Sequence, residues 1–341
     1  MTLGDNGKVM VRIGMNEFQK KTTNGAVPYT AEEIAQDAIR CGKSGGTIAH
    51  FHSRLNDGRQ ALEDDRNGAN IYRRALDLAA RQSNIIMEPT NMPYGVVSPS
   101  DRADLPHIWA LDEQPPEHGG LEIVNIDAFR FEHLKSGYDV HRNRLVTIDD
   151  NQSLRPDLPF RLPSCVQEVL DRGYTPFFGV FNMADLRLLG AYAQEGLIPK
   201  PVLVSINFFC DLMWGPTPSI EGLDAFLWQW RHMDVDSEVN LFIAGLPDMK
   251  TYEYFQEATL DRGISMRVGM GDHAAIFPGG NAQMVDHYVD LLIRRGFTPA
   301  TPNDLRQRAG LSPRDALLSA AQPKACIAAR KPWAPDPIIE A

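Results

Sequence analysis

The chain has 341 residues, of which 43% are hydrophobic and 23% are charged, and its formal net charge is −10. This composition is typical of a folded globular protein, and it excludes a largely disordered chain. No apolar run reaches the roughly 18 residues that a membrane-spanning helix needs, and the acidic charge disfavours nucleic acid or an anionic membrane as a partner. Because the N-terminal residues lack the layout of a secretory signal, we expect a cytoplasmic protein.

Short apolar or β-branched segments alternate with amphipathic segments of helical length along the chain, a rhythm that predicts parallel strands joined by crossover helices. The expected strands are residues 9–14, 47–52, 84–88, 122–128, 175–181, 202–208, 239–244 and 265–270. The clearest helices are residues 31–43, 70–82, 163–172, 183–195, 219–233, 249–262 and 281–295. The sequence therefore predicts an α/β fold, a (β/α)8 TIM barrel.

Two local signals support this interpretation. Thr30 and Glu33 have the spacing of a capping box, which predicts the start of the first helix. The rival fold, an open doubly wound sheet, normally has a glycine-rich phosphate-binding turn after its first strand, and residues 14–17 (Gly-Met-Asn-Glu) are not such a turn.

The long polar stretches 91–120 and 133–159 are expected to be loops at the C-terminal face of the barrel. We expect one catalytic barrel domain over residues 1–311 and a proline-rich C-terminal arm over residues 312–341. Such arms cover a neighbouring subunit or the barrel floor more often than they carry chemistry, and we expect a homo-oligomer, either a dimer or a tetramer.

Active sites of such barrels lie at the C-terminal ends of the strands. The second strand ends in His50 and His52, which are two residues apart and so point to the same side. Two unrelated polar residues would also fit this position, but paired histidines at a barrel mouth favour a metal site. Arg267 near the end of the eighth strand is either a carboxylate anchor or part of an interior ion pair.

Several segments, in this order and spacing, resemble the family of β-keto acid cleavage enzymes, and the resemblance spans most of residues 9–311. The matching segments are residues 27–35, 50–54, 179–182, 267–270, 281–285 and 300–306. The resemblance implies a zinc-dependent TIM barrel, or one with another divalent metal. It also implies that the enzyme condenses a β-keto acid with acetyl-CoA and cleaves the product to acetoacetate and an acyl-CoA.

The same resemblance implies roles for individual residues. His50 and His52 match the metal-binding histidines of the family. Arg267 matches the arginine of the family's motif at the eighth strand, and Asp272 matches the aspartate that acts as the base. The third metal ligand of the family is a glutamate after the eighth strand, and Gly271 stands in its place here. The family's strand-five glutamate likewise appears as Gly179.

Because Gly271 offers no ligand, another residue or water must complete the metal site. If the chain stays extended after the eighth strand, His273 shares the direction of position 271, so we favour it over Glu88 at the end of the third strand. Glu17, after the first strand, is a candidate for orienting a substrate or a solvated loop acid. Asn125 and Asp127 of the fourth strand are candidate hydrogen-bond partners of the histidines or an interior polar layer.

Two other functions stay open at this point. The missing acids also fit a metal-dependent hydrolase or lyase that acts on a related carbonyl compound without coenzyme A. The loss of the glutamate at position 271 would further fit a barrel that has lost catalysis and serves as a binding protein.

Overall fold

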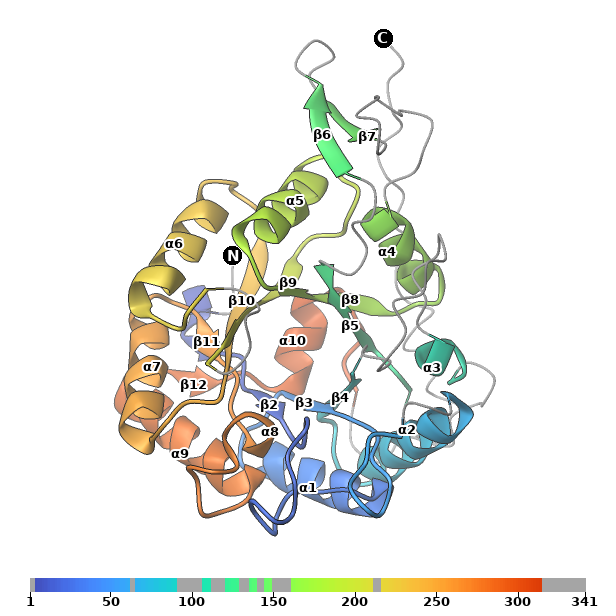
Figure 1. Cartoon of the computed structure of the whole chain (residues 1–341), viewed down its shortest axis with the longest axis vertical. Coiled ribbons are helices and arrows are strands. Elements are labelled where there is room, and N and C mark those ends of the chain that lie inside the picture. Colours follow the sequence, from blue (N-terminus) through green and yellow to red (C-terminus); the bar gives the residue numbers. More distant parts are fainter. Residues whose placement is uncertain are drawn as a thin grey trace.

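The computed structural model describes most of the chain. The described residues are 4–61, 65–90, 106–111, 120–128, 135–139, 144–148, 161–210 and 216–314. Within these ranges, parallel strands form a barrel surrounded by helices (Figure 1). The predicted (β/α)8 barrel is confirmed.

Eight parallel segments form the wall of the barrel: β2 (Arg12–Gly14), β3 (Ile48–Phe51), β4 (Ile86–Pro89), β5 (Ile123–Asp127), β8 (Thr175–Val180), β9 (Val202–Phe209), β10 (Ser237–Ala244) and β11 (Ser265–Met266). They pair in chain order as β2-β3-β4 and as β5-β8-β9-β10-β11, and β5 lies next to β4. The barrel closes where the Val268 N–H donates to the Arg12 carbonyl at 3.0 Å and the Gly14 N–H donates to the Val268 carbonyl at 2.8 Å. At the N-terminal end, β1 (Lys8–Val9) pairs with β12 (Thr298–Pro299).

Helices cover the outside of this wall: α1 (Ala31–Lys43), α2 (Asp65–Ala80), α3 (Pro106–Trp109), α4 (Arg161–Asp171), α5 (Met183–Gln194), α6 (Ile220–Arg231), α7 (Met249–Asp261) and α9 (Asn281–Arg294), with a short 3-10 turn, η1 (Gly4–Asn6), before β1. The expected capping box of Thr30 and Glu33 begins α1. Asn182, Ser219 and Asp248 cap α5, α6 and α7 in the same way, by accepting a backbone N–H three residues on. These caps fix where each strand-to-helix connection ends.

The N-terminal end of the barrel is filled by apolar side chains and covered by α10 (Pro302–Arg308), which lies behind the strands at the centre of Figure 1. Ile48, Ile86 and Ile123, from three neighbouring strands, form part of this apolar layer. Arg306 of α10 is fully buried and donates to the Glu122 carboxylate at 2.9 and 3.0 Å. The burial of this guanidinium is thus compensated by a paired carboxylate.

The structure differs from the sequence-based expectation in two places. The stretch 133–159, expected to be loop, contains an antiparallel hairpin of β6 (Lys135–Asp139) and β7 (Arg144–Ile148), which lies outside the ring of helices (Figure 1). After β11 the chain does not stay extended, because it turns at Gly269, where φ is 130°, into the short helix α8 (Met270–His273). The extended geometry that favoured His273 is therefore wrong.

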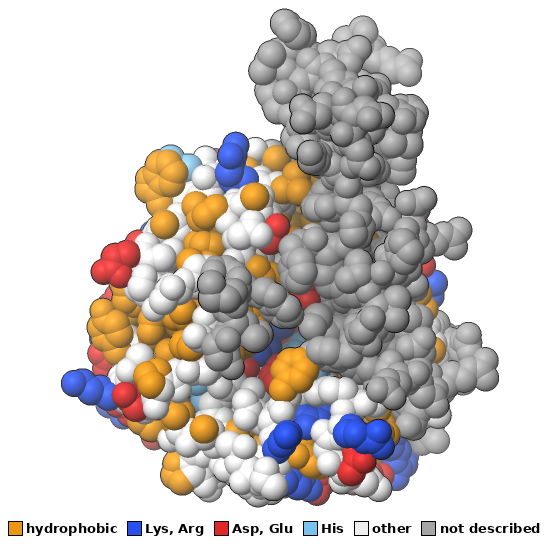
Figure 2. Space-filling model, in the orientation of Figure 1, with side chains coloured by type: hydrophobic (Ala, Val, Ile, Leu, Met, Phe, Trp, Pro, Cys, Tyr) orange, Lys and Arg blue, Asp and Glu red, His pale blue; other side chains and the backbone are white. Residues whose placement is uncertain are grey.

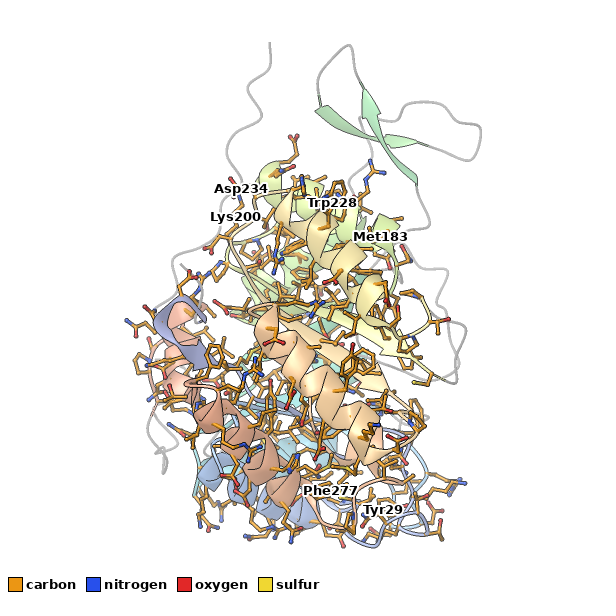
Figure 3. The ribbon with its side chains drawn as sticks, turned by 90° about the vertical axis from the view of Figure 1, so that its left-hand side faces the viewer. Tyr29, Met183, Lys200, Trp228, Asp234 and Phe277 are labelled. Carbon is orange, nitrogen blue, oxygen red and sulfur yellow. The ribbon has the colours of Figure 1, made fainter. Side chains whose placement is uncertain are left out.

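The side view in Figure 3 separates the two ends of the barrel. Tyr29, Met183 and Phe277, which follow strands, lie toward one end, and Lys200 and Asp234, which precede strands, lie toward the other. Residues 315–341 of the expected arm lie outside the described residues, so the domain boundary stays a prediction. Among the described helices, none has both the length and the apolar character needed to cross a membrane.

Candidate metal and active site

Charged and imidazole side chains gather at the C-terminal ends of β2, β3, β4 and β11. Figure 2 views this end of the molecule and shows acidic and basic side chains deep in a hollow at its centre. The buried members of the group are Arg12, Glu17, His50, His52, Glu88, Arg267 and Asp272. Buried charges are costly unless they are paired or bind an ion, so the contacts of each one matter.

His50 lies in β3 and His52 directly follows that strand, and both side chains point into the barrel. Their ring centroids lie 5.6 Å apart, while the ring of Phe51 between them packs on Tyr72 of α2 on the outer side. The expected common direction of the two histidines is confirmed.

Glu17 lies in the loop after β2 and brings a carboxylate to both histidines. Its Oε2 lies 2.5 Å from His52 Nε2, and its Oε1 lies 3.4 Å from His50 Nε2. Glu17, His50 and His52 are a group of potential metal ligands within the described residues, with donor atoms all within 4.8 Å of one another. The sequence had suggested a substrate-orienting acid at this position, not a member of the ligand group.

The backbone of Glu17 adopts a φ of 30°, a left-handed conformation that non-glycine residues seldom take. Such conformations cost about 1–3 kcal/mol and are concentrated at functional sites. The surrounding structure therefore holds this carboxylate in place against a local backbone preference.

The charge of Glu17 is stabilised by its neighbours. Burial alone would raise its pKa, but the positive charge of Arg267 and the two histidines hold the pKa well below its ordinary value. Burial lowers the pKa of His50, and the carboxylates of Glu17 and Glu88 oppose this only in part. The group thus consists of a carboxylate anion and an imidazole biased toward its neutral form, which are the forms that bind a metal.

Arg267 and Asp272 form a two-point ion pair beside this group. Arg267 donates to the two carboxylate oxygens of Asp272 at 2.9 and 2.5 Å, and its Nη2 also lies 3.0 Å from Glu17 Oε1. Burial raises the pKa of Asp272 to about 7, with Arg267 opposing the shift and Glu17 adding to it. Of the two alternatives for Arg267, the interior ion pair is the arrangement present.

Glu88, the second candidate for the third ligand, is occupied by another partner. Both of its oxygens accept hydrogen bonds from Arg12, each at 2.8 Å, and Oε2 lies 3.7 Å from His50 Nδ1. Burial would raise the pKa of Glu88, but Arg12 and His50 lower it to about 2. Its position suits a carboxylate that orients the His50 ring through Nδ1, while Nε2 of the same ring faces Glu17.

His273 lies in α8, and its ring packs against Tyr252 of α7 with centroids 4.6 Å apart. It does not belong to the ligand group of Glu17 and the two histidines. Within the described part of the chain neither ring nitrogen has a hydrogen-bond partner, and burial lowers the pKa of His273 to about 3. The structure thus separates His273 from His50 and His52.

Gly271 explains why Glu17 can occupy its position. A Cβ atom at residue 271 would lie 2.5 Å from Glu17 Cγ and 2.9 Å from the carbonyl carbon of Gly14. A side chain at residue 271 and the observed side chain of Glu17 therefore exclude each other. The absence of a side chain at 271 and the presence of Glu17 beside the histidines are two parts of one arrangement.

Gly179 on β8 makes room for two polar side chains from neighbouring strands. A Cβ atom there would lie 2.5 Å from Asp127 Oδ1 and 2.9 Å from Asn207 Nδ2. Asp127 therefore faces the barrel interior, as expected from its strand position, and Asn125 is buried on the same strand. Their expected role as partners of the histidines stays a prediction.

Gln60 contacts the ligand group and was missed by the sequence analysis. Its Oε1 lies 3.2 Å from His52 Nδ1, and its Nε2 donates to the Glu17 carbonyl at 2.7 Å. The dipeptide Asp57-Gly58 is a turn signal that could have indicated a return of the chain toward His52.

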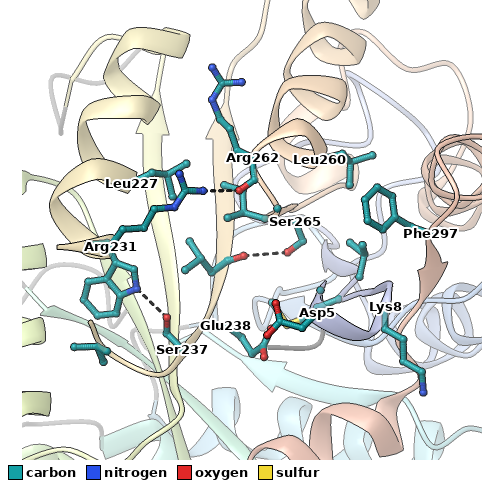
Figure 4. A pocket seen from close by; sticks show the side chains of 18 of the residues that line it. Asp5, Lys8, Leu227, Arg231, Ser237, Glu238, Leu260, Arg262, Ser265 and Phe297 are labelled. Atoms are coloured by element: carbon teal, nitrogen blue, oxygen red, sulfur yellow. Dashed lines mark hydrogen bonds between the residues drawn. The ribbon is translucent and has the colours of Figure 1, made fainter. Parts of the chain in front are cut away.

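A separate pocket of about 390 Å³ lies at the opposite end of the barrel, between α6, α7 and the starts of β10 and β11 (Figure 4). Its charged side chains have partners: Lys8 pairs with Asp304 at 2.6 Å, and Arg262 pairs with Asp224. Among the described residues, its lining holds no group of potential metal ligands, in contrast to the mouth of the barrel.

Comparison with known families gives a clear result. The sequence profile of the β-keto acid cleavage enzymes matches residues 8–311. The chain belongs to this family. The likeness inferred from the motifs is thus confirmed, and so is the class of the protein, which is that of an enzyme family.

Two characterised relatives are similar over most of their length. The 3-keto-5-aminohexanoate cleavage enzyme of Fusobacterium nucleatum subsp. nucleatum is 25% identical over 295 residues, which cover 84% of this chain and 92% of that protein. The 3-dehydrocarnitine:acetyl-CoA trimethylamine transferase of Rhizobium meliloti is 23% identical over 304 residues, covering 84% and 91%.

Solved structures of ObcA share the fold. Its complex with oxaloacetate has a TM-score of 0.55 at 16% identity, covering 84% of this chain and 68% of ObcA. Its ternary complex with a C4-CoA adduct and oxalate has the same TM-score at 15% identity, with the same coverage.

Proposed function

We propose that this member of the family is a divalent-metal enzyme, with zinc as its metal, that cleaves a β-keto acid with acetyl-CoA into acetoacetate and an acyl-CoA. The observation that carries the proposal is the group of Glu17, His50 and His52 at the mouth of the barrel. The activities of the two relatives, one a 3-keto-5-aminohexanoate cleavage enzyme and one a 3-dehydrocarnitine:acetyl-CoA trimethylamine transferase, support the type of reaction.

The side chains fit a metal. Two imidazoles and one carboxylate are the ligand set of many catalytic zinc sites, which keep a fourth position open for water or substrate. Glu17 Oε1 is buried and accepts no hydrogen bond from the described residues, and Oε2 directly faces His52 Nε2. An oxygen and a nitrogen this close share a proton, and a metal ion held by both side chains would take the place of that proton.

We therefore assign Glu17, not His273 or Glu88, as the third ligand. Glu17 is the acid whose oxygens reach both histidines, whereas Glu88 is bound by Arg12 and His273 packs on Tyr252. The acid from the first strand thus takes the place of the glutamate that the family carries at residue 271.

A bound divalent ion would polarise the keto oxygen and stabilise a developing enolate. Asp272 would then take a proton from carbon two of the β-keto acid, and Arg267 holds its carboxylate in position by two hydrogen bonds. We also propose that Arg267 anchors the substrate carboxylate. Steady-state kinetics of Arg267→Ala would test this, because loss of the anchor should chiefly weaken substrate binding.

The overall reaction balances without an oxidant or reductant. Carbon two forms a bond to the acetyl carbon of acetyl-CoA, and the CoA thiolate leaves. Attack of that thiolate on carbon three then breaks the bond between carbons two and three, which gives acetoacetate and the new acyl-CoA. The proton taken by Asp272 returns to the released acetoacetate.

One experiment separates this proposal from a CoA-independent hydrolase or lyase. Protein prepared without added metal is assayed for metal content by elemental analysis and for turnover of β-keto acids with and without acetyl-CoA. We expect one metal ion per chain, and acetoacetate only when acetyl-CoA is present. Turnover without acetyl-CoA would favour the hydrolase or lyase, and protein with neither metal nor turnover would favour a barrel that has lost catalysis.

A further inference from the structure

The segment after β3 folds back on itself and returns to the ligand group. The backbone of Arg54 pairs with that of Gln60 in an antiparallel bridge, and the Ala61 N–H donates to the Ser53 carbonyl at 3.0 Å. Gly58 makes the turn with a φ of 87°. This hairpin, residues 53–61, brings Gln60 beside a histidine that precedes it by eight residues.

The amide of Gln60 has a defined orientation. Its Nε2 lies 2.7 Å from the Glu17 carbonyl oxygen, which can only accept, so this end of the amide must be the nitrogen. The other end is therefore the oxygen, and it lies 3.2 Å from His52 Nδ1. Because an amide oxygen only accepts, His52 must carry a proton on Nδ1.

We propose that Gln60 is a positioning residue that accepts a hydrogen bond from Nδ1–H of His52 and thereby leaves Nε2, which faces Glu17, as the ring nitrogen that binds the metal. The inference rests on the proposed metal site. A metal-bound histidine commonly donates its other ring N–H to a fixed acceptor, which sets the ring orientation and raises the basicity of the ligand. Here the acceptor is a side-chain amide held by the backbone of a second ligand.

The same hairpin holds the strained backbone of Glu17. Arg54 donates to the carbonyls of Asn16, Glu17 and Gln19 at 3.1, 2.5 and 2.8 Å, and it returns to Gly58 of its own turn at 2.8 Å. The Glu17 carbonyl thus receives donors from both Arg54 and Gln60. Gln60 therefore links the position of one proposed ligand, Glu17, to the ring orientation of another, His52.

The test compares three variants in the full-length protein. Gln60→Met preserves the length of the side chain but removes both hydrogen bonds. Gln60→Glu keeps an acceptor for His52 Nδ1 and loses only the donor to Glu17. Arg59→Ala is the matched control, because Arg59 is on the same hairpin, its side chain is 71% exposed, and it pairs with the exposed side chain of Asp57.

Two measurements are made on each variant. Nitrogen-15 NMR of the metal-free protein reports whether Nδ1 of His52 carries a proton, separately from Nε2, which faces the Glu17 carboxylate. Competition with a chelator gives the affinity for Zn²⁺. We expect a proton on Nδ1 in the wild type and in Gln60→Glu, and its loss in Gln60→Met with an affinity lower by about 10–100-fold. Arg59→Ala should match the wild type.

Absence of a proton on Nδ1 of His52 in the wild type, or an unchanged Zn²⁺ affinity in Gln60→Met, would overturn the inference. If Gln60→Met does not fold, retention of the Nδ1–H form in Gln60→Glu supports the inference and its loss overturns it. A wild-type protein that binds no Zn²⁺ would contradict the proposed function, yet the protonation of His52 Nδ1 in that protein would still decide the role of Gln60.

Discussion

The two ends of the barrel interior differ in how their buried polar groups are paired. At the N-terminal end, the buried guanidinium of Arg306 lies beside an apolar layer, and each of its nitrogens donates to Glu122, Asn303 or the Asn84 carbonyl. At the C-terminal end, Glu17 Oε1 and His50 Nδ1 are buried and form no hydrogen bond with the described residues, and their charged neighbours Arg267 and Glu88 lie 3.0 and 3.7 Å away. The Arg306 guanidinium is thus fully paired within the protein, whereas the acids and imidazoles at the other end keep atoms that a bound ion can use.

The left-handed backbones differ between the two ends in what surrounds them. Asp234 (φ 49°) is exposed in the turn before β10 at the N-terminal end. Glu17 (φ 30°) is buried beside the two histidines at the C-terminal end, and its backbone is held by hydrogen bonds from the next hairpin. The buried strain therefore lies at a potential metal ligand.

Removal of both histidines should give the largest effect and show whether the two ends are independent. His50→Ala together with His52→Ala should abolish metal binding and lower turnover by about 10⁴-fold or more, because the Lewis acid contributes several kcal/mol to lowering the barrier. The thermal unfolding temperature measured in chelator should stay close to that of the wild type, since the apolar layer at the other end is untouched.

His273→Ala is the matched control for this experiment, because it removes another buried histidine near the same end. It should keep the wild-type affinity for Zn²⁺. Loss of metal in His273→Ala, or full metal content in the double variant, would contradict the assigned ligand group.

Asp272→Asn should separate proton transfer from metal binding. The amide keeps the shape of the carboxylate and one acceptor for Arg267, but it cannot take a proton. We expect turnover to fall by about 10²–10⁴-fold, as for a positioned base, with one metal ion still bound per chain. Steady-state kinetics and elemental analysis of the same preparation check this, and unchanged turnover would remove Asp272 from the mechanism.

Much of the fold was predictable because it depends on local patterns. Strand and helix alternation, together with the capping residues Thr30 and Glu33, predicted the barrel and the position of α1. The β6–β7 hairpin was missed, because β6 (Lys-Ser-Gly-Tyr-Asp) has no apolar alternation and β7 (Arg-Leu-Val-Thr-Ile) is a five-residue, largely apolar run inside a long polar stretch. Regular alternation predicts the wall of the barrel better than it predicts additions outside it.

The site was predictable only in part. The common direction of His50 and His52 follows from strand periodicity, and the structure confirms it. The contact of Glu17 with these histidines depends on one left-handed backbone angle and on the empty space beside Gly271, neither of which strand periodicity reveals. The preference for His273 failed to anticipate α8, because Gly269 allows a turn that an extended strand would not make.

Glu122→Gln tests the N-terminal end. It leaves the buried charge of Arg306 without its anionic partner, which we expect to lower the free energy of unfolding by about 3–5 kcal/mol. Affinity for Zn²⁺ should not change, because the substitution lies at the opposite end of the barrel. Urea denaturation in chelator and metal competition measure the two quantities, and a loss of metal affinity would show that the two ends are coupled.

This effect should depend on pH in a defined direction. Burial raises the pKa of Glu122, but Arg314 and Arg306 lower it below its ordinary value in the folded protein. The stabilisation is therefore complete above the unfolded-state pKa of about 4.3 and is lost as the pH falls through the lower folded-state pKa. The stability difference between the wild type and Glu122→Gln should accordingly shrink in acid, and a difference that grows in acid would contradict this assignment.

Glu17→Gly should give the smallest change in stability. Glycine adopts a φ of 30° without steric cost, so the substitution relieves strain of about 1–3 kcal/mol while it removes a proposed metal ligand. Part of this gain is offset by the greater freedom of glycine in the unfolded chain, about 0.4–1 kcal/mol, and by the lost contact with Arg267. Glu17→Gln is the control, because it also loses the charge but keeps the strained backbone. In chelator, where bound metal cannot contribute to stability, Glu17→Gly should be more stable than Glu17→Gln by about 1 kcal/mol, while both bind Zn²⁺ far more weakly than the wild type. If Glu17→Gln were the more stable of the two, the backbone conformation of residue 17 would not lower the free energy of unfolding. The difference between the two ends would then lie only in the pairing of their buried polar atoms.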